Sequence, residues 1–117
     1  MDYKELDVWS QARKLVKSVY VITEFFPKQE QYGLTSQIRR CVVSVSSNIA
    51  EGCGRRTSAD TIRFLHISRG SLYELETQLI LANDLEYIKS DINIVLGDVE
   101  RVKKLLSGFI NYQRKIG

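Results

Sequence analysis

A short polar group in the middle of the chain has the residue types of an active site. Asn48 and Glu51 stand about one helical turn apart, with Ser47 and Arg55 close by in the sequence. General acid–base catalysis would need a second titrating group that converges on the same pocket. The single histidine, His66, lies in another segment, where it is expected to be structural or exposed. These residues therefore predict a structural role and a non-enzymatic protein.

The structural role that we expect is a polar network. A buried carboxylate without a partner is very costly, so we expect Glu51 to meet an arginine such as Arg69 or Arg39. Asn48 would belong to the same network. The alternative is that Asn48 and Glu51 only terminate a helix by bonding to the backbone and to neighbouring side chains.

Neither cysteine has the setting of a nucleophile or a metal ligand. Cys41 lies on an apolar stripe and Cys53 between two glycines, and their spacing fits neither a disulfide framework nor a zinc site. Thiol chemistry would also need an activating base. The carboxylates are dispersed, and no phosphate-binding glycine loop is present. We therefore expect neither a metal nor a cofactor.

Arginines are the remaining functional lead. Residues 39–69 hold six arginines and two acids, whereas residues 71–100 hold seven acids and one lysine. Arginine makes planar, bidentate contacts to phosphate, and phosphate contacts give salt-dependent affinity for RNA or DNA. The nucleic-acid patch that we predict, near the connection between the second and third helices, comprises Arg39, Arg40, Arg55, Arg56 and Arg63. The alternative is that these arginines form salt bridges between subunits, with the acidic region as partner.

Size and composition indicate an ordinary globular chain. Its 117 residues are 44% hydrophobic and 26% charged, with a net charge of +3, which predicts one domain over residues 1–117. No apolar run approaches the roughly 20 residues of a membrane span, and no secretory signal is visible. We expect a cytoplasmic protein.

Four segments have the apolar spacing of amphipathic helices. The first runs from about Leu6 to Phe26, before Pro27. The second begins near Thr35 or Ser36 and stops at Gly52 and Gly54, and the third begins after Thr57 or Ser58 and fades at 83–84. The fourth begins near Ser90 and reaches the basic C-terminal end. Short connections predict an all-α, antiparallel up-down-up-down four-helix bundle.

Two further features concern packing. The first and third helices have more apolar residues than one core face needs, namely Trp9, Val16, Tyr20, Phe64, Ile67, Leu81 and Leu85. This excess favours a homo-oligomer, although a wide core face is the alternative. Small residues, with Gly70 among them, suggest a close approach of the second and third helices that would offset the helix-destabilising effect of this glycine.

The motifs Tyr32–Arg40, Ser47–Gly52 and Arg69–Leu75, with Arg63-Phe64-Leu65 between them, resemble a bacterial family. It is that of the four-helix-bundle proteins encoded in intervening sequences of large-subunit ribosomal RNA genes. The resemblance runs from about residue 6 to 88, and the chain is also similar to the accessory variability determinant of diversity-generating retroelements. One departure is Ser46, where the family usually has proline.

The resemblance implies a four-helix bundle assembled as a pentameric ring. For the accessory determinant it implies a basic surface that binds nucleic acid and a reverse transcriptase as partner. For the intervening-sequence proteins themselves it implies no defined biochemical activity.

Overall fold

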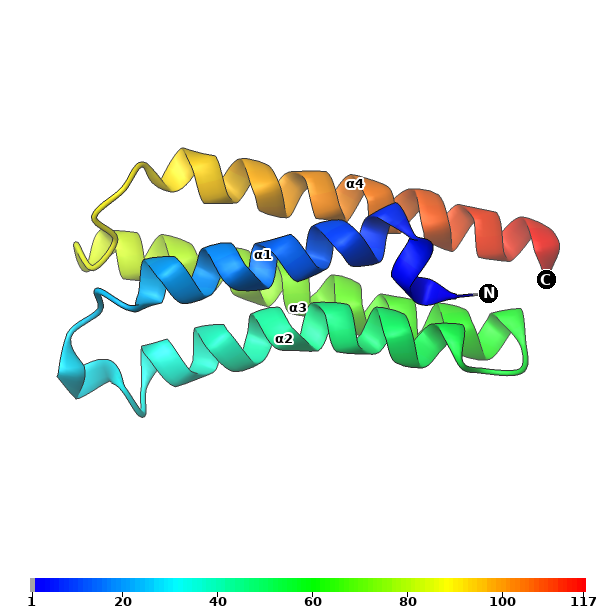
Figure 1. Ribbon diagram of the computed structural model, residues 1–117, viewed down its shortest axis with the longest axis horizontal. Coiled ribbons are helices and arrows are strands. Elements are labelled where there is room, and N and C mark those ends of the chain that lie inside the picture. The colour runs from blue at the N-terminus through cyan, green and yellow to red at the C-terminus, as the bar shows by residue number, and fades with distance from the viewer. Residues whose placement is uncertain (1) are drawn as a thin grey trace.

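The structure, a computed structural model, describes residues 2–117, and this part of the chain contains helices and turns but no strand. Two short 3-10 helices, η1 (Tyr3–Glu5) and η2 (Lys28–Glu30), precede the first two long helices. The long helices are α1 (Asp7–Thr23), α2 (Leu34–Cys53), α3 (Ser58–Asp84) and α4 (Ile92–Ile116). Consecutive long helices run antiparallel (Figure 1), which confirms the predicted up-down-up-down bundle.

Each long helix packs against two others in the cyclic order α1, α2, α3, α4, and the most extensive contact joins α2 and α3. The bundle is elongated, with extents of 45 × 25 × 20 Å. The chain termini and the α2–α3 connection lie at one end, and the other two connections lie at the opposite end (Figure 1). No helix within residues 2–117 combines the length and the apolar character needed to cross a membrane.

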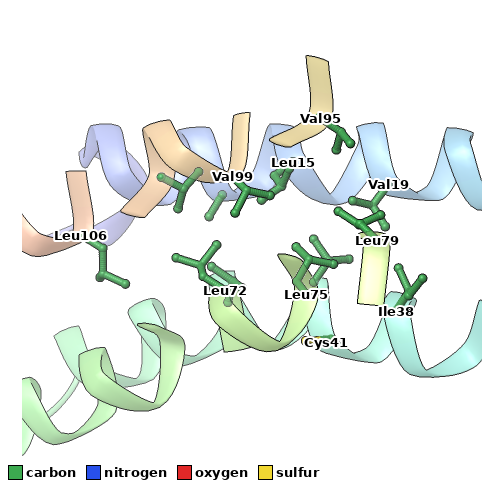
Figure 2. Packing of buried hydrophobic residues seen from close by; sticks show 14 of the residues in the cluster. Leu15, Val19, Ile38, Cys41, Leu72, Leu75, Leu79, Val95, Val99 and Leu106 are labelled. Atoms are coloured by element: carbon green, nitrogen blue, oxygen red, sulfur yellow. The ribbon is translucent and has the colours of Figure 1, made fainter. Parts of the chain in front are cut away.

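The core is built from the predicted apolar stripes. Every predicted stripe residue of α2 and α3 is buried, and so are most of those of α1 and α4. Figure 2 shows that the α3 leucines lie among side chains of the three other helices, which include Leu15, Val19, Ile38, Val95 and Val99. The 3.6-residue period therefore places one face of each helix in a common core.

The start of α2 and the end of α1 differ from the sequence prediction. Neither Thr35 nor Ser36 caps α2, because the Glu30 carboxylate reaches forward and accepts the Leu34 N–H at 3.1 Å. The first helix ends at Thr23 and not at Phe26. Phe26 could not continue it, since the residue before a proline is driven out of the α region, but this effect does not explain the loss of the two residues before Phe26. The third helix begins directly after Thr57, as expected, and the Thr57 hydroxyl caps it by accepting the Asp60 N–H at 3.1 Å.

Glu30 also joins two connections that are distant in sequence. Its second carboxylate oxygen accepts a hydrogen bond from the Tyr87 hydroxyl at 2.9 Å. This bond to a carboxylate raises the pKa of Tyr87 above its usual value, because the bond stabilises the protonated phenol. Gly33 leaves room for the carboxylate, since a Cβ there would lie 2.7 Å from Glu30 Oε1.

The contact between α2 and α3 is close and is made by small polar residues. Ser68 donates to the Val45 carbonyl at 2.8 Å, and the hydroxyls of Ser44 and Ser71 lie 2.9 Å apart. The predicted close approach is therefore present, but Gly70 has no part in it. A Cβ at Gly70 would meet nothing within 4 Å, whereas a Cβ at Gly52 would lie 3.1 Å from Phe64 Cβ. The prediction for Gly70 was wrong because this glycine lies on the exposed side of α3.

Glu86 ends α3 in a backbone conformation that favours glycine. Its φ is 63°, and the Tyr87 N–H bonds to the Ala82 carbonyl at 3.0 Å while the Glu86 N–H bonds to Asn83 at 2.9 Å. These two bonds form a Schellman motif, which places its C′ residue in the left-handed region.

Replacing Glu86 with glycine is therefore expected to stabilise the fold. Left-handed backbone strains a residue that has a Cβ, so Glu86→Gly should raise the free energy of unfolding by about 1 kcal/mol. Urea denaturation measures the change. Glu100→Gly is the matched control, because it makes the same chemical change inside α4 and should lower stability by about 1 kcal/mol. Equal losses in both variants would contradict the explanation.

Candidate nucleic-acid interface

The five candidate arginines form two groups and not one patch. Arg39 and Arg40 lie in the first half of α2, whereas Arg55, Arg56 and Arg63 surround the α2–α3 connection. Cys53, the last residue of α2, is 13 positions beyond Arg40, which corresponds to roughly 20 Å at 1.5 Å per residue. A single patch was expected because the residues are close in sequence, but a straight helix carries the two pairs apart.

The second group is organised around one aromatic ring. The guanidinium carbons of Arg55 and Arg63 lie 4.3 and 4.5 Å from the centroid of the Phe64 ring. Phe64 itself is buried, so the ring is a fixed platform. We call Arg55, Arg56, Arg63, Phe64 and Asp60 the arginine–Phe64 cluster. Its cation–π contacts restrict the freedom of two guanidinium groups that are still partly exposed.

Asp60 holds the same two arginines from the first turn of α3. Its carboxylate lies 3.0 Å from Arg63 Nη2 and 3.8 Å from Arg55 Nε. Arg55 also lies 3.2 Å from Glu51, one turn back on α2. The cluster contains three arginines, whereas Asp60 and the neighbouring Glu51 supply only two carboxylates, so a net positive charge remains. Arg56 is exposed and makes no salt bridge with the described residues.

Arg39 is used inside the chain. Its Nε donates to the Thr23 hydroxyl at 2.8 Å, its Nη2 lies 3.4 Å from the Tyr20 carbonyl, and its guanidinium lies 4.6 Å from the Tyr20 ring centroid. Positive charge is favoured beside the carbonyls at the end of a helix. Arg39 therefore ties α2 to the end of α1, whereas its neighbour Arg40 is exposed.

The residues predicted to form a polar network do not meet within one chain. Asn48 donates to the Ser44 carbonyl at 2.8 Å and to its hydroxyl at 2.9 Å. Glu51 is exposed and pairs with Arg55, while Arg69 is exposed and has its guanidinium 5.9 Å from the Tyr73 ring centroid. The expectation of a buried Glu51 that pairs with Arg69 or Arg39 was wrong for the single chain. Glu51 lies on the solvent side of α2, where an arginine four residues on is the nearest partner.

The thiols and the histidine lack a catalytic setting. Burial, with a contribution from Glu74, raises the pKa of Cys41 to about 12, and its thiol donates to the Ser71 carbonyl at 3.1 Å. Burial also raises the pKa of Cys53. His66 is exposed. Within residues 2–117, no three His, Cys, Asp or Glu side chains are grouped so that they could hold a metal ion.

Apolar side chains remain exposed on two sides of the bundle. Ile67, Leu81 and Leu85 lie on α3 and its end, as the sequence predicted, whereas Phe64 is buried and was wrongly counted with them. The second surface is a groove of about 460 Å³ between α1 and α4 that includes Val21 and Ile94, and it was not predicted from the sequence. Ile94 is 68% exposed. Both surfaces are candidates for subunit contacts, and the homo-oligomer stays a prediction.

The role of Asp60 in organising the arginine–Phe64 cluster was not predicted from the sequence either. Asp60 was counted only as one of the two acids in residues 39–69. The available signal was spacing, since Asp60 and Arg63 are three residues apart on one helix and such pairs meet. The stacking of Arg55 on Phe64 depends on how the α2–α3 connection turns, which the sequence pattern does not specify.

Comparisons with known proteins bear on the fold and the family. The family model for the 23S rRNA-intervening sequence protein matches residues 4–108. A crystal structure of a protein with unknown function, from the S23 ribosomal protein family of Bacteroides thetaiotaomicron, superposes with a TM-score of 0.80. It is 26% identical, and the match covers 88% of this chain and 97% of that one. The search of curated proteins finds no match.

Proposed function

The chain belongs to the 23S rRNA-intervening sequence protein family, and we propose that it is a non-enzymatic, oligomeric helical bundle that binds nucleic acid, RNA in the first place. The observation that carries the proposal is the arginine–Phe64 cluster. The buried Phe64 ring and the Asp60 carboxylate hold the guanidinium groups of Arg55 and Arg63, and Arg56 stays exposed beside them. Such groups bind phosphate oxygens at a low cost in side-chain entropy.

Assembly would strengthen this binding. A closed ring of identical subunits repeats the cluster, and the positive fields of several clusters add over the ring. The exposed apolar side chains of α3 and of the α1–α4 groove are the surfaces that we assign to subunit contacts. Light scattering measures the mass of the particle in solution, and a monomer would remove this part of the proposal.

The second candidate is a structural or protein-binding module whose arginines make salt bridges. It is favoured by the carboxylates that already face Arg55 and Arg63. It is also favoured by Arg39, which donates a hydrogen bond to Thr23 within the chain and so has a structural role. In that case Arg40 and Arg56 would pair with acidic residues of a neighbouring subunit, and nucleic acid would bind weakly and without dependence on the cluster.

The deciding experiment compares RNA binding across salt concentrations for the protein and for an Arg55→Ala, Arg56→Ala, Arg63→Ala variant. Each phosphate contact contributes about 0.7–0.9 to the slope of log K against log salt. The variant is therefore expected to lose about 2 units of slope and to bind at least about tenfold more weakly at low salt. Fluorescence anisotropy with a labelled single-stranded RNA gives both quantities.

Two controls make the result specific. An Arg13→Ala, Arg101→Ala, Lys104→Ala variant removes the same charge from other exposed positions and should keep most of the affinity. Arg55→Lys with Arg63→Lys keeps the charge but removes the planar fork, so the slope should remain while the affinity falls. Equal losses in the two triple variants, or a flat salt response, would favour the second candidate.

A further inference from the structure

A cleft of about 570 Å³ lies at the end of the bundle opposite the arginine–Phe64 cluster. Its walls come from the last turns of α1, the α1–α2 connection and the first turns of α2, and include Lys17, Tyr20, Lys28, Thr35 and Arg39. Its volume is within the range of about 300–1,000 Å³ that is usual for small-molecule sites. Neither the family nor the proposed function assigns a role to this cleft.

A buried hydroxyl in the cleft has no partner. Thr35 is 8% exposed, and its Oγ1 makes no hydrogen bond with any of the described residues. Buried polar atoms are nearly always paired, so an exception requires an explanation. Thr23, also buried, accepts the Arg39 Nε hydrogen bond in the same wall. The cleft therefore has a polar wall at Thr23 and Arg39. The Thr35 oxygen lies behind the surface of this wall and is closed to solvent, so a ligand could bond to it only after a rotation of the Thr35 side chain.

The charge of the cleft favours an anion. Lys17, Lys28 and Arg39 line it against a single acid, Glu24. Thr35 is in the first turn of α2, where the partial positive charge of a helix start adds to the attraction. Neither lysine makes a salt bridge with a described residue. The two lysines are thus free to neutralise a phosphate.

The cleft also offers aromatic surface. Tyr20 and Phe26 line it together with Pro27. Arg39 stacks on the Tyr20 ring, yet Tyr20 is still 40% exposed. Planar heterocycles stack on aromatic rings and on guanidinium planes. A ligand with a phosphate at one end and a planar ring at the other would match both parts of the cleft.

We propose that this cleft binds one nucleotide, either free or as the phosphorylated end of a nucleic-acid chain. The lysines would hold the phosphate, the Thr35 hydroxyl would bond to it or to the sugar, and Tyr20 with Arg39 would hold the base. The site does not depend on the arginine–Phe64 cluster, because the length of α2 separates the two.

Calorimetric titration of the full chain with adenosine 5′-monophosphate tests the proposal, with adenosine and inorganic phosphate as partial ligands. We expect the nucleotide to bind at least about tenfold more tightly than either part, because each part makes only some of the contacts. A 5′-phosphorylated trinucleotide, compared with its 5′-hydroxyl form, tests whether the cleft binds the phosphorylated end of a nucleic-acid chain. Absence of binding by both the mononucleotide and the trinucleotide at millimolar concentration would overturn the proposal.

Variants locate the binding in the cleft. Lys17→Ala with Lys28→Ala, and separately Thr35→Val, should each weaken nucleotide binding by about tenfold or more. Thr35→Val should leave thermal stability unchanged or higher, because it removes an unpaired hydroxyl and keeps the shape. Thr77→Val on α3 and the Arg55, Arg56, Arg63 triple variant are controls that should bind the mononucleotide as tightly as the unchanged protein. Unchanged binding in the cleft variants would place the nucleotide elsewhere and contradict the inference.

Discussion

Shortening Leu75 to alanine is expected to lower the free energy of unfolding by about 2–5 kcal/mol. Leu75 is fully buried, and Figure 2 shows it between α3 and the helices that carry Leu15, Val19 and Ile38. The substitution removes three carbon atoms, so the free energy gained by transferring them from water to the core is lost. It also leaves a cavity that the close-packed neighbours fill only partly. Urea denaturation followed by circular dichroism measures the loss.

Leu81→Ala is the matched control, because it makes the same chemical change six residues further along α3. Leu81 is 49% exposed, so its loss should change stability by no more than about 0.5 kcal/mol in a monomer. A larger loss that grows on dilution of the protein would show that Leu81 lies in a subunit contact. Similar losses at both positions in a monomer would contradict the core described above.

Replacing Gly52 with valine is expected to cost about 2–3 kcal/mol by overpacking the α2–α3 contact. A Cβ at this position would already lie 3.1 Å from Phe64 Cβ and 3.2 Å from the Thr61 carbonyl oxygen. Thr61 also donates its hydroxyl to the Gly52 carbonyl at 2.8 Å, so the two backbones cannot separate without breaking that bond. Thermal and urea unfolding report the loss of stability.

This substitution should also disturb the arginine–Phe64 cluster, since Phe64 is the residue that must move. RNA affinity, measured at a temperature where the variant is still folded, should therefore fall together with stability. Gly70→Ala is the control, because its site is open and alanine is the better helix former. It should raise stability by about 1 kcal/mol. If Gly52→Val left the stability unchanged, α2 and α3 would be able to move apart without cost, which would contradict the close contact described above.

The helices and the core followed from the sequence because both depend on local spacing. Residues such as Ile38, Val45 and Ile49 recur with the helical period, and this period alone decides which side of α2 is buried. Short connections then leave neighbouring helices few arrangements other than an antiparallel one. Pro27 and Thr57 acted locally as expected, so the ends that they control were predicted within a few residues.

The start of α2 could not be predicted in this way. Glu30 caps it from four residues upstream, and it is held there by a hydrogen bond from Tyr87 in another connection. Thr35 and Ser36 had the right residue types for capping, but a carboxylate that arrives through tertiary structure took the role. Long-range contacts of this kind leave no periodic trace in a sequence.

The candidate site was predicted in its residue types and not in its arrangement. Arginines close in sequence were expected to form one patch, but helical rise separates Arg40 from Arg55 and tertiary contacts engage Arg39. Glu51 was expected to be buried because it lies near the apolar stripe, yet one residue of rotation on a helix turns a side chain by about 100°. The ring that orders Arg55 and Arg63 was recognised only as surplus apolar surface.

The bond between Glu30 and Tyr87 has a consequence for how the bundle opens. It links residues that are 57 positions apart and joins the α1–α2 connection to the α3–α4 connection. The two helical hairpins are therefore coupled at that end, and local fraying there must release both connections together. At the opposite end the ion pairs of the α2–α3 connection join only sequence neighbours. Backbone amides beside the arginine–Phe64 cluster should thus exchange with solvent before those around Glu30, so we expect the bundle to open first at the end that carries the cluster.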